Sequence, residues 1–451
     1  MATLDASIVN VALPQVAATL RVNLPLVQWV VTAYLLAISC LLPLFGRLGD
    51  MYGRRRVYNA GFLVFTLGSL LCGLSGHIGP LIAARVVQAV GAAMLMANAP
   101  AIVAATFPGP DRGRALGLVG MIVALGSMTG PSIGGFLVGA FGWEAIFYVN
   151  LPIGIVGFAA GWRLLPGNPP RRGEKFDYGG AVLFAAGMIT FLLAVSHGEE
   201  WGWRSPLVLS LAAVALLAFA SFALVEKRQP FPMIDFALFK NWAFLSGNIT
   251  GLLSFMAAFS NTMLLPFYLS RILGLDPSLI GLLMTPFPIV LAVVAPVSGL
   301  LSERVNPALL SAAGLAVTAA GLAWMATLAA AAALWQVALG QALLGLGNGL
   351  FQSPNNNSVM SAVPPAKLGL AGGINSLVRN VGQVCGIAVA VSICESVQAA
   401  LLAGLPQPGP AQQAAAFLAG YHTAVSVGAA FAALGALLSF RRRAHLRPAR
   451  R

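Results

Sequence analysis

The sequence predicts an all-α polytopic membrane protein. Of its 451 residues, 58% are apolar and only 9% are charged, and the mean hydropathy is +0.85. A soluble globular domain carries roughly a quarter charged residues. Apolar stretches longer than the about 20 residues that a helix needs to cross a bilayer recur along the chain. A soluble core could not bury this much apolar surface with so little charge left to face water, so the chain belongs in a membrane.

The distribution of positive charge excludes nucleic acid as a partner. The formal net charge is +13 and the pI is near 10.4. A nucleic-acid-binding surface needs a concentrated basic face, whereas the basic clusters here recur at alternate gaps between apolar runs. The cysteines lie inside apolar runs without metal-ligand spacing: Cys40, Cys72, Cys385 and Cys394. The sequence contains no nucleophile, metal or cofactor constellation, so we predict neither an enzyme nor a bound cofactor or metal.

Apolar runs separated by turn residues and charges predict fourteen membrane spans, with boundaries accurate to about four residues. Several spans contain Gly and Pro, which membrane helices tolerate when neighbouring helices satisfy the backbone. The spans are expected near residues 1–20, 26–47, 57–76, 79–106, 113–141, 144–165, 177–197, 205–226, 242–271, 278–301, 307–328, 333–361, 367–400 and 417–440.

Lysine and arginine segregate to one side of these spans. When the N-terminus is placed in the cytoplasm, all but five of the 26 Lys and Arg residues fall in cytoplasmic segments. Three fall outside (Arg21, Arg204 and Arg271) and two fall within spans (Arg85 and Arg379). Because cytoplasmic loops carry an excess of positive charge, this pattern supports both the number of spans and their direction. Both termini are predicted to be cytoplasmic, in a multi-pass protein of the inner (cytoplasmic) cell membrane.

Two similar loops predict a repeated architecture. Gly46 to Arg56 ends the second span and Gly299 to Asn306 ends the tenth, with Glu303 in the position of Asp50. Both loops are cytoplasmic, as a parallel repeat of two six-helix halves requires, and spans seven and eight form an extra central pair. The predicted domains are an N-terminal six-helix bundle (1–165), a two-helix central insert with cytoplasmic linkers (166–240), a C-terminal six-helix bundle (241–440) and a basic cytoplasmic tail (441–451).

The first span is expected to be truncated. Asp5 closely follows Met1, and Pro14 is expected near the outer surface. If Asp5 lies near mid-bilayer, the about nine residues to Pro14 cover about 14 Å, which is one leaflet. The sequence before Asp5 is too short for the about ten residues that the other leaflet needs. We therefore expect Met1 to be an internal methionine or the start of a shortened chain.

Two charged residues inside spans, Asp5 and Arg85, are the candidate proton-coupling pair. A carboxylate at the bilayer centre costs about 2.5–3.5 kcal/mol and so marks a functional site. Burial favours the neutral form of a carboxyl group and a nearby cation favours the charged form, so helix movement can switch proton binding. A guanidinium in hydrocarbon also needs an acid or a wet cavity. The alternatives are that Asp5 only hydrogen-bonds one helix to another and that Arg85 extends to the outer interface.

Two glycine-rich segments are further candidates. Gly46 and Gly53 flank Asp50, and Arg54 follows, which suits a tight turn acting as a cytoplasmic gate; a plain positive-inside anchor is an equal alternative. In the fifth span, small residues recur four apart and let helices pack closely, and a proline invites a kink. The residues of this segment are Gly126, Gly130, Pro131, Gly134 and Gly135. Packing alone is the alternative role for them.

Polar residues in several of the spans are weaker candidates for a substrate path. The amides of the twelfth span can line such a path, or can hydrogen-bond between helices, which is their commoner role. In the thirteenth span, Arg379 is expected to line a cavity, whereas Glu395 is expected near the membrane interface. The candidate substrate path consists of Asn10, Gln88, Gln352, Asn355 and Arg379.

These motifs resemble those of the major facilitator superfamily, and within it the 14-span drug:proton antiporter family. The resemblance covers almost the whole chain. It rests on the first-helix motif (Leu4 to Pro14), the loop motif after helix two (Gly46 to Arg56), the fourth-helix motif (Arg85 to Gln88) and the helix-five antiporter motif GxxxGPxxGG (Gly126 to Gly135). Departures are Ala89 and Glu144, where the family commonly has glycine and arginine, and Glu303 in the second-half loop.

The resemblance implies a role for each motif. Asp5 and Arg85 would form the proton-coupling region, and Asp50 with Arg54 would act in the cytoplasmic gate. The helix-five glycines and Pro131 would seal the pathway against leak. The helix-five motif is associated with exporters rather than importers, and so implies the direction of transport.

We therefore predict a proton-coupled antiporter that exports amphipathic or cationic organic compounds by alternating access, which is multidrug efflux and a basis for antibiotic resistance. Its expected partners are small organic substrates, protons and membrane lipid, its energy source is the proton motive force, and it is expected to be a monomer. A dedicated exporter of one endogenous metabolite or antibiotic and a lipid flippase are alternatives. A non-transporting membrane scaffold or sensor is the alternative from another class.

Overall fold

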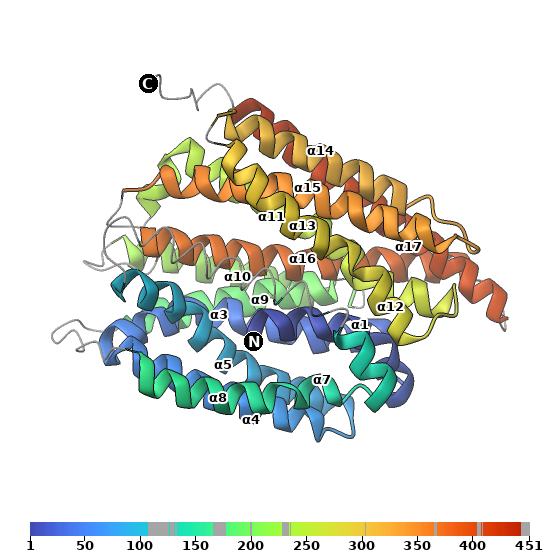
Figure 1. Ribbon diagram of the computed structural model, residues 1–451, viewed down its shortest axis with the longest axis horizontal. Coiled ribbons are helices and arrows are strands. Elements are labelled where there is room, and N and C mark those ends of the chain that lie inside the picture. Colours follow the sequence, from blue (N-terminus) through green and yellow to red (C-terminus); the bar gives the residue numbers. More distant parts are fainter. Residues whose placement is uncertain are drawn as a thin grey trace. The chain divides into compact units, whose positions relative to one another are not determined.

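The structure, a computed structural model, describes residues 1–106, 126, 130, 133–165, 177–198, 201–227, 234, 236–302, 304–364, 368–403, 407 and 409–442. Within these residues almost every segment is helical and none forms a strand (Figure 1). Nine helices of the described part are long and apolar enough to cross a membrane. The chain is thus a multi-pass helical membrane protein, as its composition predicts.

The chain divides into two compact units. The first consists of Met1–Gly130, Leu137–Ala194 and Trp201–Asp235, and the second of Pro131–Phe136, Val195–Glu200 and Phe236–Arg451. The first unit contains α1 (Ala2–Leu20), α2 (Leu24–Val27), α3 (Trp29–Tyr52), α4 (Arg54–Gly73), α5 (Ile78–Thr106), α7 (Ala145–Tyr148), α8 (Asn150–Leu164), α9 (Tyr178–His197) and α10 (Pro206–Glu226). The predicted domain boundaries at residues 165 and 240 stay predictions.

The second unit begins with a short 3-10 helix, η1 (Phe236–Lys240). The α-helices that follow are α11 (Trp242–Arg271), α12 (Pro277–Met284), α13 (Pro286–Leu301), α14 (Pro307–Met325), α15 (Leu334–Ser361), α16 (Leu368–Leu402) and α17 (Pro410–Arg442). Helix α11 packs against α16 and α17, and α14 packs against α15 and α17. Glycines make these contacts close: a Cβ at Gly314 would lie 2.6 Å from the Gly347 carbonyl oxygen.

The helices lie within a few residues of the predicted spans, with three kinds of difference. The second, sixth and tenth spans are each built from two consecutive helices, which meet at Gln28, Val149 and Thr285. Of the fifth span, residues 133–141 are helical and most of the remainder lies outside the described residues. The last helix begins at Pro410 rather than at 417. Its first turn is polar and contains Gln412 and Gln413, so the apolar run by which the span was predicted starts later than the helix does.

Close packing of α4 on α5 shapes the first unit. Figure 1 shows α4 lying beside α8 in this unit, and α5 also packs against α3. Two glycines of α4 and α5 allow the approach. A Cβ at Gly91 would lie 2.7 Å from Phe65 Cα, and one at Gly68 would lie 2.5 Å from Gln88 Cα. The backbones therefore touch at these points, as small residues permit between membrane helices.

This packing predicts the effect of adding one methyl group. Gly91→Ala is expected to lower the free energy of unfolding by about 1–3 kcal/mol, because the new Cβ overlaps the α4 backbone and the helices must move apart. The matched control is Gly79→Ala in the same helix, where a Cβ meets nothing within 4 Å. Thermal unfolding of the two purified variants in detergent, beside the unmodified protein, measures the loss of stability in each. Equal unfolding temperatures for the two variants would contradict the packing described here.

Candidate functional site

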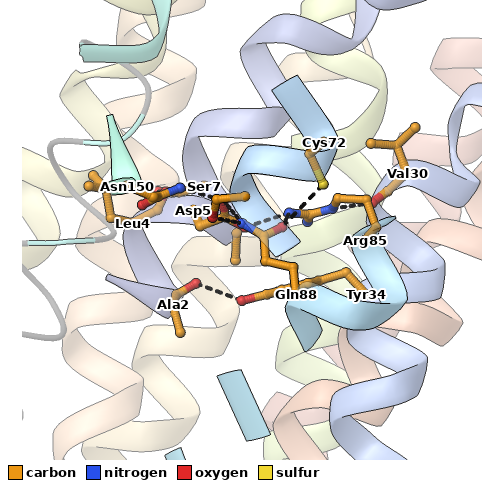
Figure 2. Close-up of polar contacts among 12 residues, drawn as sticks. Ala2, Leu4, Asp5, Ser7, Val30, Tyr34, Cys72, Arg85, Gln88 and Asn150 are labelled. Atoms are coloured by element: carbon orange, nitrogen blue, oxygen red, sulfur yellow. Dashed lines mark hydrogen bonds and ion pairs between the residues drawn. The ribbon is translucent and has the colours of Figure 1, made fainter. Parts of the chain in front are cut away.

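Asp5 and Arg85 form a buried ion pair in the first unit. Asp5 lies in the first turns of α1, and Arg85 lies two turns into α5. One guanidinium nitrogen, Arg85 Nη1, is 2.5 Å from Asp5 Oδ2, and both side chains are fully buried (Figure 2). The arginine therefore turns into the helix bundle and does not extend to the interface. Removing both charges from water costs several kcal/mol for each ion, so the pair is stable only when its other polar atoms are also bonded.

Two amides complete the environment of the carboxylate. Gln88 Nε2 donates to Asp5 Oδ1 at 2.8 Å, and Asn150 Nδ2 donates to the same oxygen at 3.0 Å. Gln88 Nε2 also lies 2.7 Å from Ser69 Oγ on α4. The close approach at Gly68 positions this contact, because it brings the α4 backbone against that of Gln88. Helices α1, α4, α5 and α8 thus all contribute to one polar cluster, which we call the Asp5 cluster: Asp5, Ser69, Arg85, Gln88 and Asn150.

The guanidinium has partners besides the carboxylate. Arg85 Nε donates to the Val30 carbonyl oxygen at 2.8 Å, and Nη1 donates to Gln88 Oε1 at 2.5 Å. Its carbon lies 4.0 Å from the centre of the Tyr34 ring, in the geometry of a cation–π interaction. Tyr34 also donates through its hydroxyl to the Ala2 carbonyl oxygen at 3.2 Å, which ties α3 to the start of α1. Arg85 Nη2 is buried without a hydrogen-bond partner in the described part of the chain.

Sequence reasoning missed three members of this site. Ser69, Tyr34 and Asn150 are each in a long apolar run, and their exposed fractions are 0%, 1% and 1%. Asn150 carried a usable signal, since an amide within a span needs a hydrogen-bond partner in the bundle. Gln88 was placed on the substrate path from sequence, and the structure places it in the Asp5 cluster.

The loop between α3 and α4 is a one-residue turn. Gly53 has φ of 98°, a backbone conformation that glycine adopts without strain. Arg54 Nη1 donates to the Ala101 carbonyl oxygen on α5 at 3.0 Å, so this arginine crosses to a neighbouring helix. Gly46 faces Ala97 of α5. The side chain of Asp50 lies outside the described residues, and the gating role of this loop stays a prediction.

Three of the fifth-span glycines lie close to other segments of the chain. In the first unit, a Cβ at Gly126 would lie 3.1 Å from Thr3 Oγ1, and one at Gly130 would overlap the Ser7 side chain on α1. In the second unit, a Cβ at Gly135 would lie 2.6 Å from the Pro277 carbonyl oxygen. Gly134 is buried, and Pro131 lies outside the described residues. Close packing is therefore observed at Gly126, Gly130 and Gly135, and the role of the motif in sealing the pathway stays a prediction.

The remaining substrate-path candidates are dispersed. Asn10 donates to the Ala6 carbonyl oxygen of its own helix at 3.3 Å. Asn355 is buried and connects three helices, because it donates to the Gly247 carbonyl oxygen at 3.0 Å and accepts from Arg442 Nη1 at 3.0 Å. Gln352 and Arg379 are half-buried. Glu395 lies close enough to Arg271, at the end of α11, to interact with it electrostatically.

The helical architecture defines a multi-pass membrane protein. A family model described as Major Facilitator Superfamily matches residues 1–180 and 247–450. The chain belongs to this superfamily, whose members are transporters rather than enzymes.

Several curated relatives are similar over most of their length. The riboflavin transporter RibZ of Clostridioides difficile (strain 630) is 39% identical over 86% of this chain and 84% of its own. The multidrug resistance protein Stp of Mycobacterium tuberculosis (strain CDC 1551 / Oshkosh) is 35% identical over 87% and 73%. The tetracenomycin C resistance and export protein of Streptomyces glaucescens is 32% identical over 92% and 78%.

Solved structures show the same fold at low sequence identity. A structure that describes substrate recognition in proton dependent oligopeptide transporters matches with a TM-score of 0.64 and 16% identity, over 98% of this chain and 96% of that one. A bacterial homologue of the human lysosomal transporter Spinster matches with the same TM-score and identity, over 99% and 94%. These matches establish the major facilitator fold.

Proposed function

We propose that this protein is a proton-coupled antiporter that exports amphipathic organic compounds across the cytoplasmic membrane by alternating access. The observation that carries the proposal is the Asp5 cluster, which holds one carboxylate and one guanidinium 2.5 Å apart with both fully buried. An intramembrane acid that is costly to charge and paired to a movable cation is suited to bind and release a proton. Relatives named for multidrug resistance and for antibiotic export support the direction and the breadth of substrate.

The proposed cycle uses the competition between a proton and Arg85 for the same carboxylate. When a proton from the outside reaches Asp5, the carboxyl becomes neutral and its attraction for the guanidinium is lost. Helices α1 and α5, which carry the two groups, can then move relative to each other. When the proton leaves to the cytoplasm, the ion pair forms again. In this proposal both termini are cytoplasmic and the working unit is a monomer surrounded by lipid.

The proton motive force is sufficient for this task. The membrane potential supplies about 2.3 kcal/mol per charge per 100 mV, and one pH unit adds about 1.4 kcal/mol. One proton per cycle can therefore sustain roughly a hundred- to thousandfold gradient of a neutral substrate, at about 1.4 kcal/mol for each factor of ten.

Transport by the unmodified protein in proteoliposomes tests the proposal. With an acidic lumen and protein oriented inside-out, fluorescent amphipathic dyes are expected to accumulate in the lumen, and addition of dye is expected to release protons from the lumen. A protonophore should abolish accumulation, because it removes the gradient that drives uptake. Dye movement that is unchanged by the protonophore and stops at equal concentrations would show a uniporter instead.

A dedicated flavin transporter is the second candidate function. It is favoured by the 39% identity to a protein named as a riboflavin transporter. The same proteoliposomes discriminate the two functions when riboflavin is offered alone and against an excess of unrelated amphipathic dyes. A multidrug exporter is expected to move both and to show mutual competition, whereas a dedicated transporter moves riboflavin and is not inhibited by the dyes.

A further inference from the structure

A polar stripe runs along one face of α16. Asn375, Arg379 and Gln383 are spaced four residues apart, so they lie one above the other on the same face of the helix. All three side chains are half-buried. The stripe ends at Gln383, because the residues that follow it in α16, such as Val384 and Ile387, are apolar and fully buried. Asn375 Nδ2 donates to Asn356 Oδ1 on α15 at 3.0 Å, which joins the stripe to a second helix. We call these three residues the α16 stripe.

Among the described residues of its unit, no acid lies near enough to Arg379 to neutralise its charge. Within the described part of the chain it makes no hydrogen bond or ion pair. The described acids of the second unit are engaged elsewhere: Asp276 caps the start of α12 by accepting from two backbone amides, and Glu395 interacts with Arg271. Glu395 is also sixteen residues further along α16, which is about 24 Å of helix.

A second arginine of this unit also lacks an acidic partner among the described residues. Arg442 is also fully buried, and its partner is the neutral amide of Asn355. In the first unit, the single acid of the Asp5 cluster already bonds Arg85 and two amides. Neither the Arg442–Asn355 contact nor the Asp5 cluster therefore offers a free carboxylate that could attract a cationic substrate. Arg379, in contrast, offers a half-buried guanidinium to an anionic one.

We propose that the α16 stripe binds the transported substrate and that this substrate is an organic anion, recognised through a carboxylate or phenolate by Arg379. A guanidinium in a membrane helix is costly unless it is paired, and it presents several donors in a plane that matches such oxygens. The amides of Asn375 and Gln383 lie one turn to either side and supply further donors and acceptors. This inference rests on the proposed function and narrows its substrate class from amphipathic compounds in general to organic anions. The cationic substrates predicted from sequence are then not the preferred ones.

Dye binding to the purified full chain tests the inference without transport. Fluorescein and rhodamine 123 share a xanthene core, but the first is an anion and the second a cation at neutral pH. Fluorescence polarisation in detergent is expected to show fluorescein binding at least about tenfold more tightly, since charged hydrogen bonds contribute most where solvent is excluded. Arg379→Gln is expected to weaken fluorescein binding about 10- to 100-fold and not to weaken rhodamine 123 binding, because the cationic dye loses a repulsive charge.

Two control variants make the result specific. Arg379→Lys keeps the charge and should keep the preference for the anion, although it loses the planar donor set. Arg271→Gln removes an equal charge at an exposed position of the same unit and should leave both affinities unchanged.

Equal binding of the two dyes, tighter binding of the cation, or unchanged fluorescein affinity in Arg379→Gln would overturn the inference. The comparison on the unmodified protein decides it even if Arg379→Gln does not fold. Loss of proton coupling in proteoliposomes with the dye preference intact would instead overturn the proposed function alone.

Discussion

Replacing Asp5 with asparagine is expected to abolish proton-coupled export. Asparagine has nearly the shape of aspartate and keeps an oxygen that can accept from Gln88 and Asn150, but it cannot bind and release a proton at working pH. Arg85 also keeps its contacts to Val30, Gln88 and the Tyr34 ring. The variant should therefore fold, although with lower stability because the guanidinium loses its counter-charge.

Substrate-dependent proton release in proteoliposomes measures this effect. For Asp5→Asn the signal is expected to fall to that of liposomes without protein, while equilibrative movement of substrate down its own gradient continues. The control is Thr190→Val in α9 of the same unit, which removes a hydroxyl that donates to the Ala186 and Gly187 carbonyl oxygens of its own helix, and which should retain coupling. Undiminished proton release from Asp5→Asn, at equal amounts of folded protein, would refute the assignment of Asp5 as the proton-binding group.

Removal of Arg85 is expected to have the largest effect on stability. Arg85→Ala leaves the buried Asp5 carboxylate with two neutral amide donors and opens a space between α1, α3 and α5. Removing one partner of a buried ion pair costs about 3–5 kcal/mol, since an uncompensated charge remains. Unfolding of the purified variant in mixed micelles should show a loss of this size.

The double variant Asp5→Asn/Arg85→Gln separates electrostatics from packing. It removes both charges and keeps side chains of related shape, so it should be clearly more stable than Arg85→Ala. A double-mutant cycle of Asp5→Asn and Arg85→Gln should give a coupling energy above about 1 kcal/mol, as expected for residues in direct contact. The double variant should still fail to couple protons. Additive stability effects of the two substitutions would show that the ion pair is not formed in the membrane-embedded protein.

The sequence predicted the helical architecture because membrane spans depend on local composition. Runs of about 20 apolar residues and the positions of basic residues are readable along one chain. The pairing of Asp5 with Arg85 was also predictable, since an intramembrane charge needs a partner and few were available. Gln88 is one turn from Arg85, so its presence in the same cluster followed helical spacing.

The rest of the cluster depends on how helices face one another. Ser69 reaches Gln88 because Gly68 lets the α4 backbone touch α5, and that contact joins residues 19 apart in the chain. Asn150 bonds Asp5 across 145 residues. A polar residue within an apolar run indicates that a partner exists, but only the packing of the bundle determines which one. The start of α17 was missed for a local reason, since its first turn is polar.

A cysteine beside the Asp5 cluster gives the protein a native chemical reporter. Cys72 Sγ lies 3.8 Å from Gln88 Oε1, and the thiol is fully buried. A maleimide in solution can alkylate it only when α4 and α5 separate enough to admit the reagent, so the labelling rate measures how often the cluster opens. The other cysteines, Cys40, Cys385 and Cys394, can be changed to alanine to leave this single thiol. The time that the transporter spends with its ion pair open thus becomes measurable by mass spectrometry, without attaching a fluorophore or determining a second structure.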